Sequence, residues 1–183
     1  LMSRARRWLG QNEEGEWYVP KVGTAGYRLH PDVRSAWDVW RELVTPDPAS
    51  AETPDLIQAM HLVKGQPFNG VKERRFVWGH RIRTEMIAGI ADAAHELAPR
   101  SLRAGAVPNA RFAASVGRQI DPVNELAWRN AMRAEHLAGD MAAFERIVSQ
   151  LHLQLDAIED GLEPDEETQD LINSIRGRHA MAS

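Results

Sequence analysis

The sequence predicts an all-α protein, a row of paired helices preceded by a small N-terminal β-hairpin. Two observations support this fold class. Apolar side chains recur three and four positions apart along most of the chain after residue 35, which is the spacing of one buried helix face. A pattern of helix ends and small residues also returns at a fixed interval along the chain. At 183 residues the chain is long enough to bury a substantial core.

The repeat is carried by matched positions, since Ala104-Gly105 returns as Ala138-Gly139. At the same interval, three positions are apolar in both copies: Ala110 and Phe144, Ala113 and Ile147, Ala114 and Val148. Between the copies, residues 121–124 (D-P-V-N) are typical of one helix ending and the next beginning. A repeat period of about 34 residues, with small residues on one helix, is typical of tetratricopeptide-type helix pairs. Such pairs bury their apolar faces by stacking, and the stack leaves a concave surface for a partner.

The N-terminal part has a different pattern. Residues 3–9 resemble the last turns of a helix, with Gly10 at its C-terminal cap. Residues 16–19 and 26–29 have the composition of strands, and we expect them to pair as a hairpin. We therefore expect residues 1–31 to form one unit and residues 32–183 to form the helical domain.

The helical domain is predicted to begin with a helix at residues 35–44, where Ser35 and Asp38 have the spacing of a capping box. A second helix has Pro54 in its first turn, a favoured place for proline. A long helical tract follows at residues 75–104, and Pro99 is expected to kink it or split it. Four more helices are predicted, at residues 108–119, 122–138, 141–158 and 165–175.

Composition limits the classes of function. The formal net charge of −4 gives no general attraction to nucleic acid or to anionic membranes. No run of about 18 apolar residues occurs, so we expect no membrane contact. The absence of cysteine excludes disulfides and thiolate metal sites, and the cytoplasm is the expected compartment. Residues 156–170 contain eight acidic residues and no basic one, which indicates a solvated loop and the start of a helix.

The order of several short motifs resembles one known family, the bacterial transcriptional activator domain. This domain occurs in antibiotic-regulatory (SARP-type) and EmbR-type regulators, and in membrane-anchored actinobacterial proteins that carry LysM segments. The motifs extend over nearly the whole chain, and their order is more specific than any one of them: R-R-W-L-G (6–10), Y-V-P (18–20), G-Y-R-L (26–29), W-D-V-W-R-E-L-V (37–44), L-V-K-G-Q-P-F (62–68), I-D-P-V-N-E-L-A-W-R (120–129) and D-G-L-E-P-D-E-E-T (160–168).

The resemblance implies a role for each part of the chain. Residues 3–9 would correspond to the end of a DNA-recognition helix, and residues 17–29 to the wing hairpin and closing strand of a winged helix. From Asp32 onward the chain would be a tetratricopeptide-like array used for protein contacts and self-association. Relative to the family pattern, the first strands and the first two helices of the winged helix are missing. DNA contact is therefore expected only through a region upstream of this chain, and the parent protein is either cytoplasmic or membrane-anchored.

Candidate binding residues were sought on the repeat helices and at the N-terminus. Arg118, Arg129 and Arg133, together with Trp128, are candidates for a partner-binding groove, because arginine and aromatic side chains dominate interface energies. A solvated face for the arginines and helix packing for the tryptophan are the alternatives. A weaker candidate is contact with DNA phosphates by Arg4, Arg6 and Arg7 of the first helix. The alternative for these arginines is a solvated helix end.

No pattern of catalytic or metal-binding residues is present. The seven histidines form no H-x-x-x-H or H-E-x-x-H pair, and the glycines form no phosphate-binding loop. The sequence therefore predicts a non-enzymatic regulatory module without a cofactor, acting on a protein partner or on a second copy of itself as a homodimer. Two alternatives remain: a DNA-binding transcriptional activator with a truncated winged helix, and a sensor that holds a small ligand between its helices.

Overall fold

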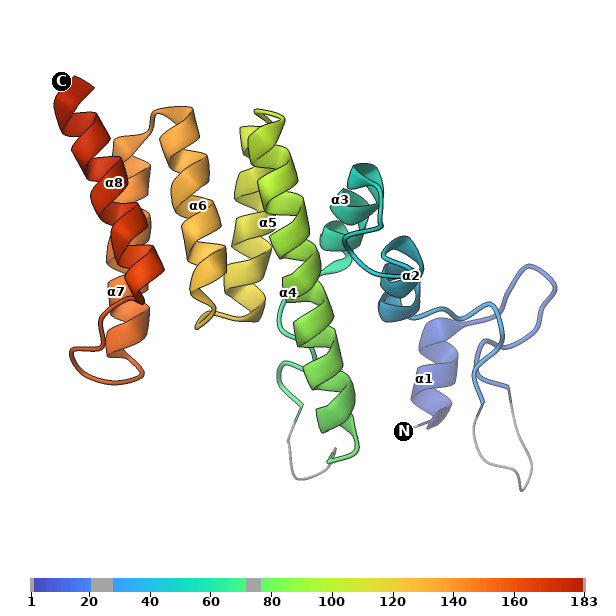
Figure 1. The fold of residues 1–183 in the computed structure, drawn as a ribbon. Coiled ribbons are helices and arrows are strands. Elements are labelled where there is room, and N and C mark those ends of the chain that lie inside the picture. Colours follow the sequence, from blue (N-terminus) through green and yellow to red (C-terminus); the bar gives the residue numbers. More distant parts are fainter. Residues whose placement is uncertain (1, 21–27, 72–76, 183) are drawn as a thin grey trace. The chain divides into compact units, whose positions relative to one another are not determined.

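The computed structural model of the chain describes residues 2–20, 28–71 and 77–182 (Figure 1). This part of the chain contains no strand, so the prediction of an all-α protein is confirmed for it. The chain divides into two compact units, Leu1–Val39 and Trp40–Ser183, and each is described by itself. The described helices are α1 (Met2–Leu9), α2 (Ala36–Leu43), α3 (Thr53–Leu62), α4 (Gly79–Arg103), α5 (Val107–Ile120), α6 (Glu125–Ala138), α7 (Met141–Asp156) and α8 (Glu166–Ala182).

In the N-terminal unit, a tight turn follows α1 just before the predicted first strand of the hairpin. The side-chain oxygen of Asn12 accepts a hydrogen bond at 2.8 Å from the backbone N–H four residues later. This bond folds the chain back, and Gln11 pairs with Trp17 in one isolated antiparallel bridge. Residues 16–19 consequently form no strand, and the predicted hairpin is not confirmed. Residues 26 and 27, half of its second strand, lie outside the described residues.

The capping box predicted at the start of α2 is confirmed. The backbone N–H of Asp38 donates to Ser35 Oγ at 3.1 Å, and the backbone N–H of Ser35 donates to Asp38 Oδ2 at 3.2 Å. Each side chain thus satisfies a backbone donor that the first turn of a helix leaves without a partner.

Helix α4 runs without a break through Pro99 to Arg103, so the proline does not split it. Leu97 and Ala98 immediately before the proline are fully buried, and Ser101 after it is 2% exposed. Burial on both sides of Pro99 keeps the backbone helical, although proline removes one hydrogen bond. The helix also begins later than predicted, at Gly79.

Two further helix boundaries differ from those predicted by three residues or more. Helix α6 begins at Glu125, three residues after the predicted start, because Asn124 is its N-cap and accepts a hydrogen bond from Leu126 N–H at 3.2 Å. Helix α8 continues to Ala182, well beyond the predicted end at residue 175.

Small side chains allow α4, α5 and α6 to pack closely against one another (Figure 1). A Cβ atom added at Gly117 of α5 would lie 3.0 Å from the Cβ of Ala127 on α6 and 3.6 Å from the Cβ of Ala94 on α4. The apolar positions matched between the two copies of the repeat are all buried as predicted: Ala110, Ala113, Ala114, Phe144, Ile147 and Val148.

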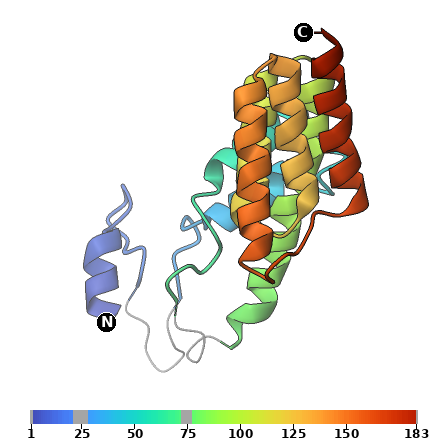
Figure 2. The ribbon, with the colours of Figure 1, turned by 90° about the vertical axis from the view of Figure 1, so that its left-hand side faces the viewer.

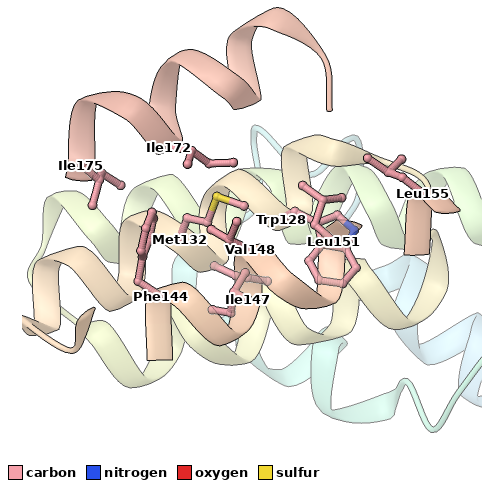
Figure 3. Close-up of a cluster of buried hydrophobic side chains, with 11 residues drawn as sticks. Trp128, Met132, Phe144, Ile147, Val148, Leu151, Leu155, Ile172 and Ile175 are labelled. Atoms are coloured by element: carbon pink, nitrogen blue, oxygen red, sulfur yellow. The ribbon is translucent and has the colours of Figure 1, made fainter. Parts of the chain in front are cut away.

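A second set of larger side chains holds α6, α7 and α8 together. Figures 1 and 2 show α8 running alongside α6 and α7. In Figure 3, Ile172 and Ile175 of α8 point toward the side chains of α6 and α7. The buried members labelled there are Trp128, Met132, Phe144, Ile147, Val148, Leu151, Leu155, Ile172 and Ile175.

We predict opposite effects for alanine at two helical glycines. Gly177→Ala on α8, where an added Cβ meets no atom within 4 Å, is expected to raise the free energy of unfolding by about 0.5–1 kcal/mol, because alanine favours helix. Gly117→Ala gains the same propensity but forces α5 away from α6, and a net loss of about 1 kcal/mol is expected. Urea unfolding of both variants measures the difference. Equal stabilisation by the two substitutions would show that α5 and α6 are not in this close contact.

Candidate functional site

Arg129 is buried in contacts with the start of α8. Its Nη1 lies 2.9 Å from both carboxylate oxygens of Asp165 and 3.0 Å from Thr168 Oγ1, and its Nη2 lies 3.1 Å from a carboxylate oxygen of Glu167. The residue is 9% exposed, and Thr168 is fully buried. These contacts occupy the guanidinium group inside the protein and tie α6 to α8.

Asp165, the residue just before α8, is hydrogen-bonded to both α8 and α6. Its carboxylate accepts the backbone N–H of Thr168 at 2.7 Å, and its own backbone N–H donates to the carboxylate of Glu125 at 3.0 and 3.1 Å. Burial by itself raises the pKa of Asp165, but the hydrogen bonds from Thr168 and Arg129 outweigh it and hold this pKa below its ordinary value. The ionised carboxylate is therefore the form that the folded protein stabilises.

Arg118 and Trp128 meet on the other side of α6. The guanidinium carbon of Arg118 lies 4.9 Å from the centre of the Trp128 ring, which is a cation–π distance. Trp128 is 6% exposed, and its Nε1–H donates to the carbonyl oxygen of Pro122 at 2.9 Å. Burial lowers the pKa of Arg118, and Glu135 partly opposes this effect. Trp128 lies in the core, which agrees with the expected alternative that this side chain packs between helices.

Arg133 lies in a different environment from Arg129, although it follows it by only one helical turn. It lines an open depression of about 440 Å³ together with Leu102 and Arg103 at the end of α4 and His136 and Leu137 at the end of α6. We call this set of five residues the α4/α6 depression. Arg133 is exposed, but partial loss of water around its guanidinium group and the charge of Arg129 lower its pKa, and Glu167 opposes this shift.

The α4/α6 depression carries a concentration of positive charge. Arg133 is exposed and forms no hydrogen bond or ion pair with the residues that the structure describes. Arg103 is also exposed, and its Nε donates to the carbonyl oxygen of Pro99 at 3.3 Å. Arg103 and His136 lie in the last turns of α4 and α6, where basic groups interact favourably with the helix dipole. Leu137, 49% exposed, adds an apolar wall.

The four predicted groove residues thus do not form one site. Arg118 and Trp128 contact each other, Arg129 is paired with α8, and Arg133 alone lines the depression. The sequence analysis missed its other four residues, although the repeat contained the signal. Leu102 and Arg103 of the first copy match His136 and Leu137 of the second, so the depression joins equivalent positions of the two copies.

The three arginines of α1 also differ in their surroundings. Arg6 donates from Nε to the carbonyl oxygen of Val19 at 2.6 Å and from Nη2 to that of Pro20 at 3.3 Å, so it holds the N-terminal unit together. Arg4 and Arg7 are exposed, and Trp8 beside them is 84% exposed. Contact with phosphates by Arg4 and Arg7 stays a prediction.

Within residues 2–20, 28–71 and 77–182, no three or more His, Asp or Glu side chains gather as metal ligands. None of the helices in these ranges is both long and apolar enough to cross a bilayer.

We predict that two arginines one turn apart on α6 differ in their importance for stability. Arg129→Met removes the buried contacts with Asp165 and Thr168 and is expected to lower the free energy of unfolding by about 2 kcal/mol, or Tm by about 4–8 °C. The matched control, Arg133→Met, should change stability by less than about 0.5 kcal/mol because the side chain is exposed. Similar losses in both variants would contradict the assigned role of Arg129.

The lowered pKa of Asp165 predicts sensitivity to acid. Its contribution to stability is fully present above the unfolded-state pKa of about 4 and is lost as the pH falls through the lower folded-state value. Thermal unfolding measured across this acidic range should show a smaller pH dependence for Asp165→Asn than for the wild type. Arg129→Met should lie between them, since the guanidinium is one of several groups that stabilise the carboxylate. Identical profiles for all three proteins would refute this account.

No family model, curated protein or solved structure matches the chain.

Proposed function

We propose that the chain is a non-enzymatic regulatory module built from tetratricopeptide-like helix pairs, which acts in the cytoplasm through contact with a partner protein or with a second copy of itself. The resemblance to the bacterial transcriptional activator domain supplies the regulatory context of this proposal. The module would act by binding alone, with no chemical step and no cofactor.

The observation that carries the proposal is the equivalence of α4 with α6 and of α5 with α7. Gly105 and Gly139, matched positions of the repeat, follow α4 and α6 with left-handed φ values of 67° and 72°. Ala110 of α5 and Phe144 of α7 are both fully buried. In addition, α4 contacts α6 directly and α6 contacts α8, so alternate helices lie side by side (Figure 1). Contacts between alternate helices support the proposal of stacked helix pairs, which form extended binding surfaces.

DNA binding is the second candidate, and it is favoured by α1 alone. Arg4 and Arg7 are exposed on this helix, where guanidinium groups could reach phosphates. The net charge of −4 works against an unassisted contact. A role in DNA binding is therefore proposed only for a protein in which a further region upstream completes the winged helix.

A small-ligand sensor receives less support. The α4/α6 depression is open and contains neither tryptophan nor methionine. Trp128 and Met132, two of the side chains that would line an internal ligand site, belong to the packed cluster of α6, α7 and α8 (Figure 3).

The proposal predicts self-association that does not depend on DNA. Light scattering coupled to size-exclusion chromatography is expected to give a mass above that of one chain, rising with protein concentration, and duplex DNA should not shift it. A monomer that binds duplex DNA, with an affinity that falls steeply as salt is added, would instead support the alternative of a truncated transcription factor.

A further inference from the structure

We infer that the α4/α6 depression binds the acidic segment 156–170 of a second copy of the chain, so that copies associate head to tail. This inference rests on the proposed function and specifies one of its forms. It starts from the chemistry of the depression, where two arginines and a histidine surround two leucines. A protein segment that binds there should therefore carry several carboxylates for the basic groups and exposed apolar side chains for the leucines.

The acidic segment has this chemistry. It contains eight carboxylates and no basic residue. Two apolar side chains are exposed within it, Ile158 at 53% and Leu162 at 36%. The side chains of Glu159, Asp160 and Glu163 form no hydrogen bond or ion pair with the described residues. Carboxylates and apolar groups are thus both available on one short stretch of chain.

Within one chain, Glu167 at the start of α8 acts on Arg133, but the loop carboxylates Glu159, Asp160 and Glu163 lie away from the depression. Helix α7 begins four residues after Leu137 and extends for 16 residues, about 24 Å, before the segment starts. The other end of the acidic loop is held by the hydrogen bonds from Asp165 N–H to Glu125, the first residue of α6. His136 and Leu137 lie in the last turn of that helix. The loop is therefore fixed at one end of α6 and the depression is at the opposite end.

A second copy has no such restriction. Its Glu159, Asp160 and Glu163 would pair with Arg103 and Arg133, for which bidentate guanidinium–carboxylate geometry is available. Ile158 and Leu162 would cover Leu102 and Leu137. Each copy carries both complementary surfaces at different places, so the contact is heterologous and produces chains or a ring. Because the charges lie at the surface, salt should weaken the association.

Two variants that each lose one of the surfaces test the inference. Arg103→Glu/Arg133→Glu reverses the charge of the two depression arginines, and Glu159→Lys/Asp160→Lys/Glu163→Lys reverses the charge of the three carboxylates expected to pair with them. All five side chains are exposed, and circular dichroism checks that both variants stay folded. Arg146→Glu/Arg178→Glu is the matched control for the depression variant, since it makes the same change of net charge at exposed positions outside the depression.

Sedimentation velocity is expected to show concentration-dependent association of the wild type and of the control variant. Raising the ionic strength from about 0.05 M to about 0.5 M should weaken this association at least about tenfold. Each surface variant alone should be monomeric, because one sets glutamates against the acidic segment and the other sets three lysines against Arg103 and Arg133. An equimolar mixture of the two should associate again, since the intact segment of one variant meets the intact depression of the other.

Other outcomes would overturn the inference. If either charge-reversal variant associates as strongly as the wild type, the association uses another surface. The proposed interaction function would then stand without the head-to-tail contact. Monomers of the wild type at every concentration, or a mixture of variants that stays monomeric, would also refute the contact. Failure of the proposed function itself has a different signature, a DNA-binding monomer.

Discussion

The close approach of α4, α5 and α6 is the constraint on which the rest of the structure depends. At Gly117 of α5 a single added carbon would touch Ala127 of α6, and the next nearest atom is the Cβ of Ala94 on α4. Small side chains bring the backbones together, so that α4 lies against α6 as well as against α5. The ends of α4 and α6 thereby become neighbours, and this places Leu102 and Arg103 beside Arg133, His136 and Leu137. The depression is a consequence of the helix spacing.

Arg129 provides a complementary constraint at the other end of α6. Alanines set the distance between α4, α5 and α6 without specifying where the following segment turns back. The ion pairs of Arg129 with Asp165 and Glu167, and the hydrogen bond from Asp165 N–H to Glu125, fix the start of α8. Ile172 and Ile175 then reach the core between α6 and α7 (Figure 3). A buried arginine would be costly without these partners, and the acidic composition of the segment supplies them.

Local and periodic features could be predicted from the sequence, and long-range pairings could not. The capping box of Ser35 and Asp38 and the burial of the positions matched between the two copies depend on near neighbours or on the repeat. The partner of Arg129 lies 36 residues away on a segment whose path no local pattern determines. Arg129 and Arg133 therefore cannot be distinguished from the sequence, although in the fold one is paired with Asp165 and the other lines the depression. The continuity of α4 through Pro99 was equally inaccessible, because it depends on how much of the helix is buried.

The positions of the charged groups are more informative about the proposed interaction than the net charge of the chain. A net charge of −4 argues against general attraction to polyanions. It conceals the separation of basic groups at the ends of α4 and α6 from the carboxylates between α7 and α8, at the opposite end of α6. Basic groups at the carboxyl ends of α4 and α6, and Glu166 and Glu167 in the first turn of α8, suit the dipoles of their helices, so helix electrostatics favours part of this separation. Because α4 and α6 lie side by side, basic residues near their carboxyl ends gather at one place, away from the loop carboxylates between α7 and α8. A protein with this architecture can therefore acquire a self-complementary surface without any residue selected solely for binding.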